Sequence, residues 1–246
     1  THFPSQSPIE IICIDSFISN GSCNNAASYG VCGGNGVYGG WWDGSPSCGV
    51  ILEDSCNDAA FGSNGVCGNN GFSFNDSGSG FISSHSCNNA AGLYVCFGNG
   101  FGNSKPGSGF ILSHSCNDAT GEWVCAFNGY GLTGTGYGII GTHSCNKGNA
   151  GTCSFNGHLG NGTIGDYSCN NATGMNGKLE SSCRENGKDG IASIGNGACN
   201  APNACNNNMG TIGDSCCNYD NGCHDNVGNI SVGTSVCSGE IQNHYS

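Results

Sequence analysis

The segment FILSHSCNDATGEWVCAFNGY, residues 110–130, contains the pattern from which we predict the fold. It opens with a short apolar run, continues into Ser-Cys-Asn at 115–117, and reaches a second cysteine at Cys125. It then turns through Asn-Gly at 128–129 into another brief apolar stretch. The same order of features recurs along the chain, so we interpret this segment as one structural repeat.

Ser-Cys-Asn occurs six times, and Ala-Cys-Asn at Cys199 and Cys-Cys-Asn at Cys217 are degenerate copies, with intervals of 18 to 33 residues. A short Ile-rich run precedes each copy, so the repeats begin near residues 17, 50, 81, 110, 139, 163, 193 and 211. A second cysteine follows each copy. The cysteines of this pattern are Cys23, Cys32, Cys56, Cys67, Cys87, Cys96, Cys116, Cys125, Cys145, Cys153, Cys169, Cys183, Cys199, Cys205, Cys217 and Cys223.

The residues of each repeat favour strands over helices. Ile outnumbers Leu by 16 to 6, and no segment keeps a 3.6-residue apolar period over three turns. The 46 glycines would each destabilise a helix by about 1 kcal/mol relative to alanine. Each repeat is therefore predicted to hold two or three short strands, with Gly and Asn at corners where the backbone φ is positive.

A unit of this length is too short to be a domain but fits one coil of a solenoid. We predict an all-β fold, a disulfide-stapled parallel β-solenoid of about eight to ten coils, forming a single domain over residues 1–246. An array of separate disulfide modules would need more large apolar residues than the repeats contain. A β-sandwich is the other alternative, but sandwiches rarely repeat one motif so regularly.

Disulfides are expected to hold this thin core together. Pairing each motif cysteine with the next cysteine closes short loops, each contributing about 2.7 kcal/mol in the chain-entropy estimate. Pairing between adjacent coils fits the same spacing, and the sequence leaves Cys13, Cys48, Cys216 and Cys237 unassigned. Zinc is disfavoured because the chain has no Cys-x-x-Cys pair.

An asparagine follows the motif cysteine in all eight copies. If the coils stack in register, these amides are predicted to form a ladder, each side chain donating to the next. A local role in the turn is the alternative. The residues are Asn24, Asn57, Asn88, Asn117, Asn146, Asn170, Asn200 and Asn218.

Composition excludes two functional classes and points to a compartment. The chain carries five lysines and arginines against 17 carboxylates, a net charge of −12, which excludes binding to nucleic-acid phosphates. No run approaches the roughly 20 apolar residues of a membrane span. Twenty cysteines are typical of a secreted, extracellular or cell-surface protein. Because the chain opens THFPSQ, we expect a processed product or part of a longer protein.

Several residues are candidates for modification or binding. Sequons predict covalent glycans at Asn20, Asn75, Asn161, Asn171 and Asn229. His85, His114 and His143 lie 29 residues apart and would form a column of imidazoles, which we interpret as repeated surface residues rather than a metal file.

Other candidates have simpler explanations. Asp220, His224 and Asp225 could hold a cation, but a solvated loop explains them as well. We predict no metal and no cofactor. The GxGxxG match within residues 160–166 is expected by chance in so glycine-rich a chain.

Two segments, TIGDYSCNNATG (163–174) and SIGNGACNAPNAC (193–205), resemble a known kind of repeat. They look like the cysteine-, glycine- and asparagine-rich repeats of secreted surface proteins in stramenopile algae such as diatoms, brown algae and chrysophytes. The resemblance covers roughly residues 16 to 225. It implies a secreted β-solenoid in a cell-wall, cell-surface or flagellar-hair context, without catalytic residues to transfer.

The leading functional hypothesis is therefore an extracellular structural subunit that self-associates by head-to-tail stacking into a fibre, flagellar hair or wall layer. Residues 9–14 would lie against the last coil near residues 230–236. A polysaccharide-active enzyme is an alternative, although Asp58 and Asp118, or Asp166 and Asp214, make poor carboxylate pairs. A carbohydrate-binding module or adhesin using Trp41 and Trp42 is another.

Overall fold

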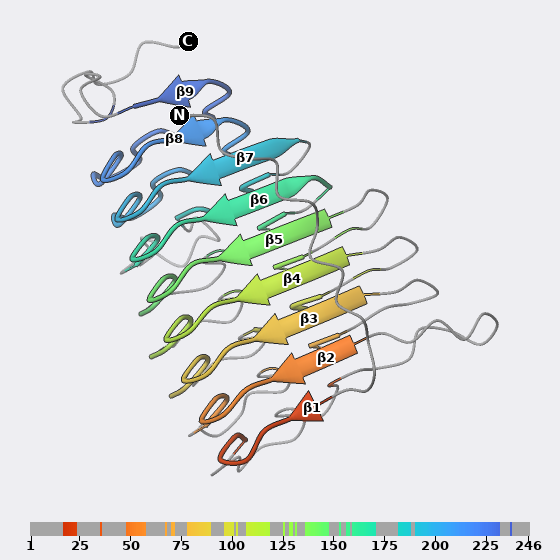
Figure 1. Cartoon of the computed structure of the whole chain (residues 1–246). Coiled ribbons are helices and arrows are strands. Elements are labelled where there is room, and N and C mark those ends of the chain that lie inside the picture. Colours follow the sequence, from red (N-terminus) through yellow and green to blue (C-terminus); the bar gives the residue numbers. More distant parts are fainter. Residues whose placement is uncertain are drawn as a thin grey trace.

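The computed structural model describes residues 17–23, 35, 48–57, 67, 70–71, 78–89, 96–100, 102, 107–118, 125, 128–129, 131, 136–147, 153, 156–157, 159–170, 182–187, 190–231 and 237. It confirms the predicted fold class, an all-parallel, disulfide-rich β-solenoid. Nine strands form one sheet in sequence order, each hydrogen-bonded to the next (Figure 1). They are β1 (Phe17–Ile18), β2 (Cys48–Ile51), β3 (Gly78–Ile82), β4 (Gly107–Ile111), β5 (Gly136–Ile140), β6 (Asn161–Ile164), β7 (Ile191–Ile194), β8 (Thr211–Ile212) and β9 (Asn229–Ile230).

The strands stack in strict register, so equivalent residues of successive repeats lie beside each other. Phe81 of β3 pairs with Phe110 of β4, and Ile82 pairs with Ile111. The strands begin earlier than the apolar runs alone predicted, because the Gly-Ser-Gly of residues 78–80 and of 107–109 is part of each strand. The register turns each repeated residue type into a column along the axis.

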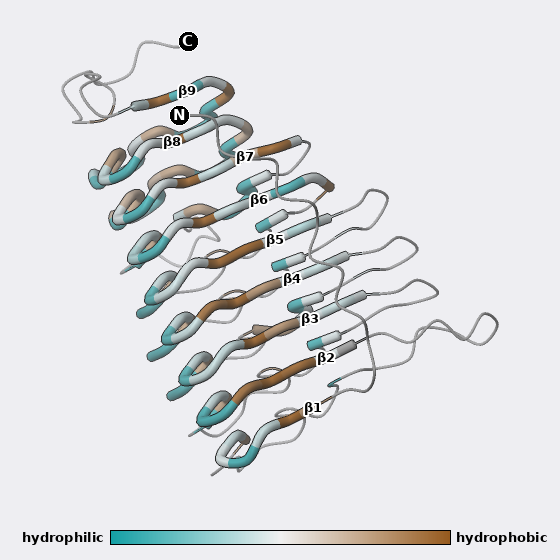
Figure 2. The backbone as a smooth tube through the Cα atoms, viewed as in Figure 1, coloured by the Kyte–Doolittle hydropathy of each residue, from teal (hydrophilic) through white to brown (hydrophobic). Residues whose placement is uncertain are grey.

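One such column forms the apolar core. The last residue of seven successive strands is an isoleucine that is at most 2% exposed. Figure 2 shows these hydrophobic segments stacked along the strands, with hydrophilic residues at the tight loops that follow. The column comprises Ile51, Ile82, Ile111, Ile140, Ile164, Ile194 and Ile212.

Glycines in the strands let the Asn-Gly turns on the opposite side of each coil, here called the opposite wall, approach the strand backbone closely. A Cβ on Gly80 would lie 1.5 Å from the carbonyl oxygen of Asn70, and one on Gly109 would lie 1.5 Å from that of Asn99. The backbone of the Asn-Gly turn therefore packs directly against the backbone of the strand. Among the described residues, the interior of a typical coil holds one isoleucine, one disulfide, one asparagine and one serine.

The expectation of two or three strands in each repeat was wrong for the described residues, where each repeat contributes one strand. The Asn-Gly turn was expected to lead into a second strand. Instead, turns of neighbouring coils bond to each other through single contacts, such as Gly100 N–H to the Asn70 carbonyl at 2.9 Å. The glycine wall replaces the side-chain layer that a second strand would have packed against.

Candidate functional site

The candidate functional features of this chain are columns of repeated polar and sulfur-bearing residues. The cysteine column lies inside the solenoid, because almost every described member is fully buried. Seven disulfides join a motif cysteine to the next cysteine of the same repeat: Cys56–Cys67, Cys87–Cys96, Cys116–Cys125, Cys145–Cys153, Cys169–Cys183, Cys199–Cys205 and Cys217–Cys223. Pairing within the coil, one of the two arrangements left open by the sequence, is thus the one the structure contains.

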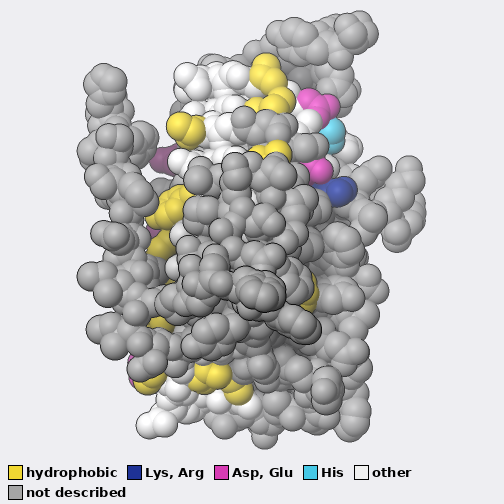
Figure 3. Space-filling view, turned by 90° about the vertical axis from the view of Figure 1, so that its right-hand side faces the viewer, with side chains coloured by type: hydrophobic (Ala, Val, Ile, Leu, Met, Phe, Trp, Pro, Cys, Tyr) yellow, Lys and Arg dark blue, Asp and Glu magenta, His cyan; other side chains and the backbone are white. Residues whose placement is uncertain are grey.

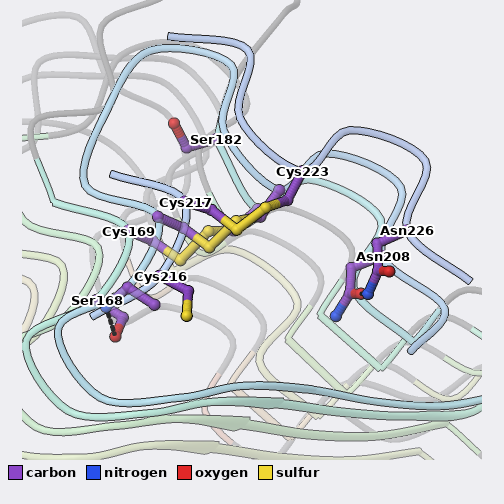
Figure 4. Close-up of a disulfide and its surroundings, with 12 residues drawn as sticks. Ser168, Cys169, Ser182, Asn208, Cys216, Cys217, Cys223 and Asn226 are labelled. Carbon is purple, nitrogen blue, oxygen red and sulfur yellow. Dashed lines mark hydrogen bonds between the residues drawn. A yellow bond between two sulfur atoms is a disulfide. The ribbon is translucent and has the colours of Figure 1, made fainter. Parts of the chain in front are cut away.

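The disulfides stack along the axis like the isoleucines. The Sγ atom of Cys87 lies within 4.8 Å of those of Cys56 and Cys67 in one neighbouring coil. Figure 4 shows a line of disulfide sulfurs that runs from Cys169 to the Cys217–Cys223 disulfide, with another disulfide between them. All of the cysteines in this line are oxidised, so the line is a covalent core and not a set of metal ligands.

The left-handed corners predicted for Gly and Asn are occupied mainly by cysteine. Of the 28 described non-glycine residues with positive φ, 15 are cysteines, with φ between 54° and 62°. An L-residue in this conformation is destabilised by about 1–2 kcal/mol relative to the right-handed region. Each of the seven within-coil disulfides thus holds two unfavourable corners in place.

The C-terminal end carries a disulfide of another kind. Cys216 and Cys237, both left unassigned by the sequence, form a disulfide across 21 residues. The Cys217 N–H donates to the carbonyl of Cys237 at 3.1 Å. In earlier coils the acceptor for the motif cysteine is a carbonyl of the next coil, as the Ser55 carbonyl is for the Cys23 N–H. Residue 237 therefore covers part of the last coil. Cys23 is disulfide-bonded, but Cys13, Cys32 and the side chain of Cys48 lie outside the described residues.

The asparagine of each motif forms a ladder with different chemistry from the one predicted. Its side-chain oxygen accepts the backbone N–H of the equivalent asparagine in the preceding coil, as in Asn88 N–H to Asn117 Oδ1 at 2.9 Å. Its Nδ2 donates to a corner carbonyl, as from Asn117 to His85 at 2.9 Å. Asn57, Asn146, Asn170, Asn200 and Asn218 continue the series, and Asn24 lies outside the described residues.

The amide-to-amide ladder lies instead at the Asn-Gly turns. Asn70 donates from Nδ2 to Oδ1 of Asn99 at 2.6 Å, Asn99 to Asn128 at 2.7 Å, and Asn128 to Asn156 at 2.7 Å. These amides are fully buried. The direction is opposite in the last coils, where Asn208 donates to Asn186 and Asn226 to Asn208, the latter pair visible in Figure 4. The sequence signal for this ladder was present, since Asn-Gly recurs at the same interval.

Substitutions in the two asparagine ladders should lower the free energy of unfolding by different amounts. Asn99→Ala leaves the buried Nδ2 of Asn70 and Oδ1 of Asn128 without partners, so we expect a loss of about 2–4 kcal/mol in the free energy of unfolding. Asn117→Ala removes bonds at a partly exposed corner and should cost about 1 kcal/mol. Denaturant unfolding of the two oxidised variants is the measurement. An equal or reversed ranking would contradict the assignment of the buried ladder.

The serine of the Ser-Cys-Asn motif links neighbouring coils through its hydroxyl, a role that the sequence did not indicate. Ser86 Oγ accepts the backbone N–H of Ser115 at 3.3 Å and donates to the carbonyl of Leu112 at 2.9 Å. Ser55, Ser115, Ser144 and Ser168 make the same pair of bonds. A buried hydroxyl thus joins two neighbouring coils at each step.

The three histidines lie on the outside of the tight corners. The ring centroids of His85 and His114 are 5.0 Å apart, and those of His114 and His143 are 4.7 Å apart, with nearly parallel planes. Tyr167 continues the column at 4.9 Å from His143. Asp54 lies before it, with Oδ2 at 3.6 Å from Nε2 of His85. The predicted imidazole column is present, together with a carboxylate that the sequence analysis did not assign to it.

The histidine column should make stability depend on pH. Desolvation, and then the charges of His143 and His85, lower the pKa of His114 below its usual value of 6.5. The unfolded chain therefore takes up its proton first as the pH falls through about 6.5, so the folded state loses stability between about pH 7 and 5. Denaturant midpoints at pH 7.5 and 5 should differ more in the wild type than in His114→Gln. An equal pH response would contradict the coupling.

The remaining candidates are dispersed. Asn20, Asn161 and Asn229 are exposed, while Asn75 and Asn171 lie outside the described residues. His224 Nδ1 contacts Asp225 Oδ2 at 2.9 Å, and a hydrogen bond from Asn207, with help from His224, lowers the pKa of Asp225.

The described carboxylates considered for catalysis serve as hydrogen-bond acceptors within the solenoid. Asp118 accepts from Nδ2 of Asn89 at 3.2 Å. Asp166 accepts the Thr142 N–H, and Asp214 accepts the Asn196 N–H, each at 2.7 Å. Asp58, Trp41, Trp42 and residues 9–14 lie outside the described residues.

The surface of the described part is sparsely charged. Figure 3 shows acidic, basic and histidine side chains near one another at the upper right of the face, further acidic side chains at its left edge, and apolar side chains at several heights. Ile191, Met209 and Val227 are among the exposed apolar residues. No helix long and apolar enough to cross a membrane occurs among the described residues.

Comparison with protein-family models, curated proteins and solved structures finds no match to this chain.

Proposed function

We propose that this chain is an extracellular structural protein whose solenoids join end to end into a fibre or surface layer. A disulfide-rich β-solenoid suits a secreted structural or surface protein, because disulfides persist in oxidising compartments and the axial columns give a stiff element. The resemblance to algal surface repeats points the same way and stays a prediction.

The observation that carries the proposal is the direction of the backbone hydrogen bonds. The residue after each strand donates its N–H to the terminal isoleucine carbonyl of the next strand, from Ser19 to Ile51 at 2.9 Å through to Gly213 to Ile230 at 2.7 Å. By the same geometry the carbonyl of Ile18 points away from β2, at the edge of the described sheet. The two ends are therefore complementary, and β9 of one molecule can continue into β1 of another.

The apolar column is also incomplete at its ends. Ile18 is 40% exposed, whereas the seven isoleucines stacked above it are at most 2% exposed. Ile230 in β9 is only partly buried and packs against the core. Stacking β9 of one molecule on β1 of the next would bury both side chains. Cys237, bonded to Cys216, accepts the Cys217 N–H on the cysteine side of the last coil, so the contact would form on the strand side.

Sedimentation velocity over a concentration series, with negative-stain imaging, tests the proposal. We expect the wild type to form linear oligomers, and Ile18→Asp to shift them toward monomers. Ile191→Asp is the matched control, because Ile191 is 79% exposed on the side of the sheet and away from the ends. Monomers at all concentrations, or equal loss of assembly in both variants, would contradict end-to-end stacking.

A further inference from the structure

The outer corner of the solenoid carries a file of side chains with metal-ligating atoms. Asp54, His85, His114 and His143 occupy the same position in four successive coils, two residues before the motif cysteine. Their spacing is set by the backbone, since the N–H of His85 donates to the Glu53 carbonyl and that of His143 to the Ser113 carbonyl, both at 3.1 Å. The imidazoles are therefore held next to each other even without a ligand.

The fold does not require imidazoles at this position. The corner has φ near 60° in all three histidines, and Gly197 and Ser215 occupy the same place in later coils with φ of 64° and 59°. Histidine in this conformation is less favourable than glycine. The ring of His85 does not fill a buried pocket either, since the side chains of His85 and Asp54 are 48% and 58% exposed.

We propose that Asp54, His85, His114 and His143 form a binding site for a divalent transition-metal ion of the Zn²⁺, Ni²⁺ and Cu²⁺ class. Neighbouring pairs in the file act as the chelating units, with the strongest centred on His85, between the Asp54 carboxylate and the His114 imidazole. Imidazole and carboxylate together are the donor set that these ions prefer, whereas Ca²⁺ and Mg²⁺ prefer oxygen alone.

Binding of one metal by a pair requires the rings to turn out of their stack. A metal with bonds of about 2.0–2.1 Å to two imidazoles needs nitrogens roughly 3.3 to 4.1 Å apart, depending on the angle at the metal. The ring centroids stand 4.7 and 5.0 Å apart and the planes lie within 4° of parallel, so the in-plane lone pairs do not converge while the rings are stacked. Neighbouring rings must rotate about their side-chain torsions until their nitrogens face one ion, and the side chain of His85, which is 48% exposed, has room to do so.

The charge around the file favours cations. The adjacent groups are acidic, with Asp54 in the file and Glu53 beside it. A net charge of −12 also attracts cations to the chain as a whole.

Calorimetric titration of the intact, oxidised protein with Zn²⁺ or Ni²⁺ alone tests the site, with Mg²⁺ as the hard-cation control. His114 belongs to both histidine pairs, so His114→Gln should weaken binding at least tenfold. His143→Gln leaves Asp54, His85 and His114 in place and should weaken it only about twofold. Asp54→Asn should give an intermediate loss. The thermal melt should rise with Zn²⁺ in the wild type and much less in His114→Gln.

His224→Gln is the matched control, because this histidine lies outside the file beside Asp225. Its binding should equal that of the wild type. No detectable Zn²⁺ or Ni²⁺ binding by the wild type would overturn the proposal. So would binding unchanged by His114→Gln, because the metal would then be held elsewhere in the chain.

Discussion

Reduction of the disulfides is expected to unfold the solenoid without any denaturant. Each within-coil bridge contributes about 2–3 kcal/mol in the chain-entropy model. Seven of these bridges and the Cys216–Cys237 bridge are described, so their sum exceeds the 5–15 kcal/mol by which a folded protein is ordinarily stable. Among the described residues, the apolar core apart from the cystines consists of one isoleucine per coil and a few alanines near the C-terminal end, which cannot replace the bridges.

The left-handed corners increase this dependence. The motif cysteines, such as Cys116 with φ 60° and Cys145 with φ 59°, are held in an unfavourable conformation by the bridge and the neighbouring coils. Once the bridge is broken, the chain can relax at these corners, and the register of the columns is lost with it. We therefore expect reduction to act on all columns together.

The measurement must avoid slow reduction of buried sulfurs. The protein is unfolded in guanidinium with a phosphine reductant, then diluted into native buffer that contains the reductant, and its far-ultraviolet circular dichroism is recorded. Protein unfolded and diluted without reductant is the control and should regain the sheet signal. Recovery of the same signal by the reduced chain would show that the bridges are not the main source of stability.

Gly109→Ala is expected to be strongly destabilising. The added Cβ would lie 1.5 Å from the carbonyl oxygen of Asn99 and 2.8 Å from Oδ1 of Asn128. The first obstacle is backbone, which cannot rotate away, so the Asn-Gly turn must separate from the strand and break the buried amide ladder. We expect a loss above about 5 kcal/mol, beyond the range of most point mutations.

Gly190→Ala is the control for this substitution, because a Cβ at that position meets no atom within 4 Å and φ is not positive. Its free energy of unfolding should lie within about 0.5 kcal/mol of the wild type. Both variants are compared by guanidinium unfolding of the oxidised protein. Similar midpoints for the two variants would show that strand and turn do not pack as closely as described.

The repeat allowed the fold class and a core held together by disulfides to be predicted, because both follow from the regular spacing of one motif. In-register stacking follows from one motif recurring in every coil, and the strands end at the Ile residues that the apolar runs indicated, such as Ile82 and Ile111. Spacing did not decide between disulfides within a coil and disulfides between adjacent coils. Sulfur atoms of adjacent coils also lie close together, since the Sγ atoms of Cys56, Cys67 and Cys87 are within 4.8 Å of one another. Only the three-dimensional arrangement distinguishes them.

The roles of individual asparagines could not be read from spacing. The motif asparagines and those of the Asn-Gly turns recur at equal intervals, and the difference is that Asn99 is fully buried while Asn117 is partly exposed. Which side chain points inward depends on how tightly the turn packs on Gly109, and that contact involves residues distant in sequence. The second strand was wrongly predicted for the same reason. Spacing alone does not show that the backbone of the Asn-Gly turn packs directly against the glycines of the strand.

The carboxylate beside the histidines had a sequence signal that was not used. Asp54 stands two residues before Cys56, as His85 stands before Cys87, so alignment on the cysteines places the two in one column. In a solenoid, the neighbours of a corner residue lie one repeat away.

The central claim, that the coils stack in register about one axis, is tested most directly by the isoleucine column. With selectively labelled Ile δ1 methyl groups, stacking at about 4.8 Å per coil predicts nuclear Overhauser effects only between successive members. The expected chain runs Ile51, Ile82, Ile111, Ile140, Ile164, Ile194 and Ile212. Absence of the Ile82–Ile111 and Ile111–Ile140 contacts, or contacts that skip members of the column, would contradict the account.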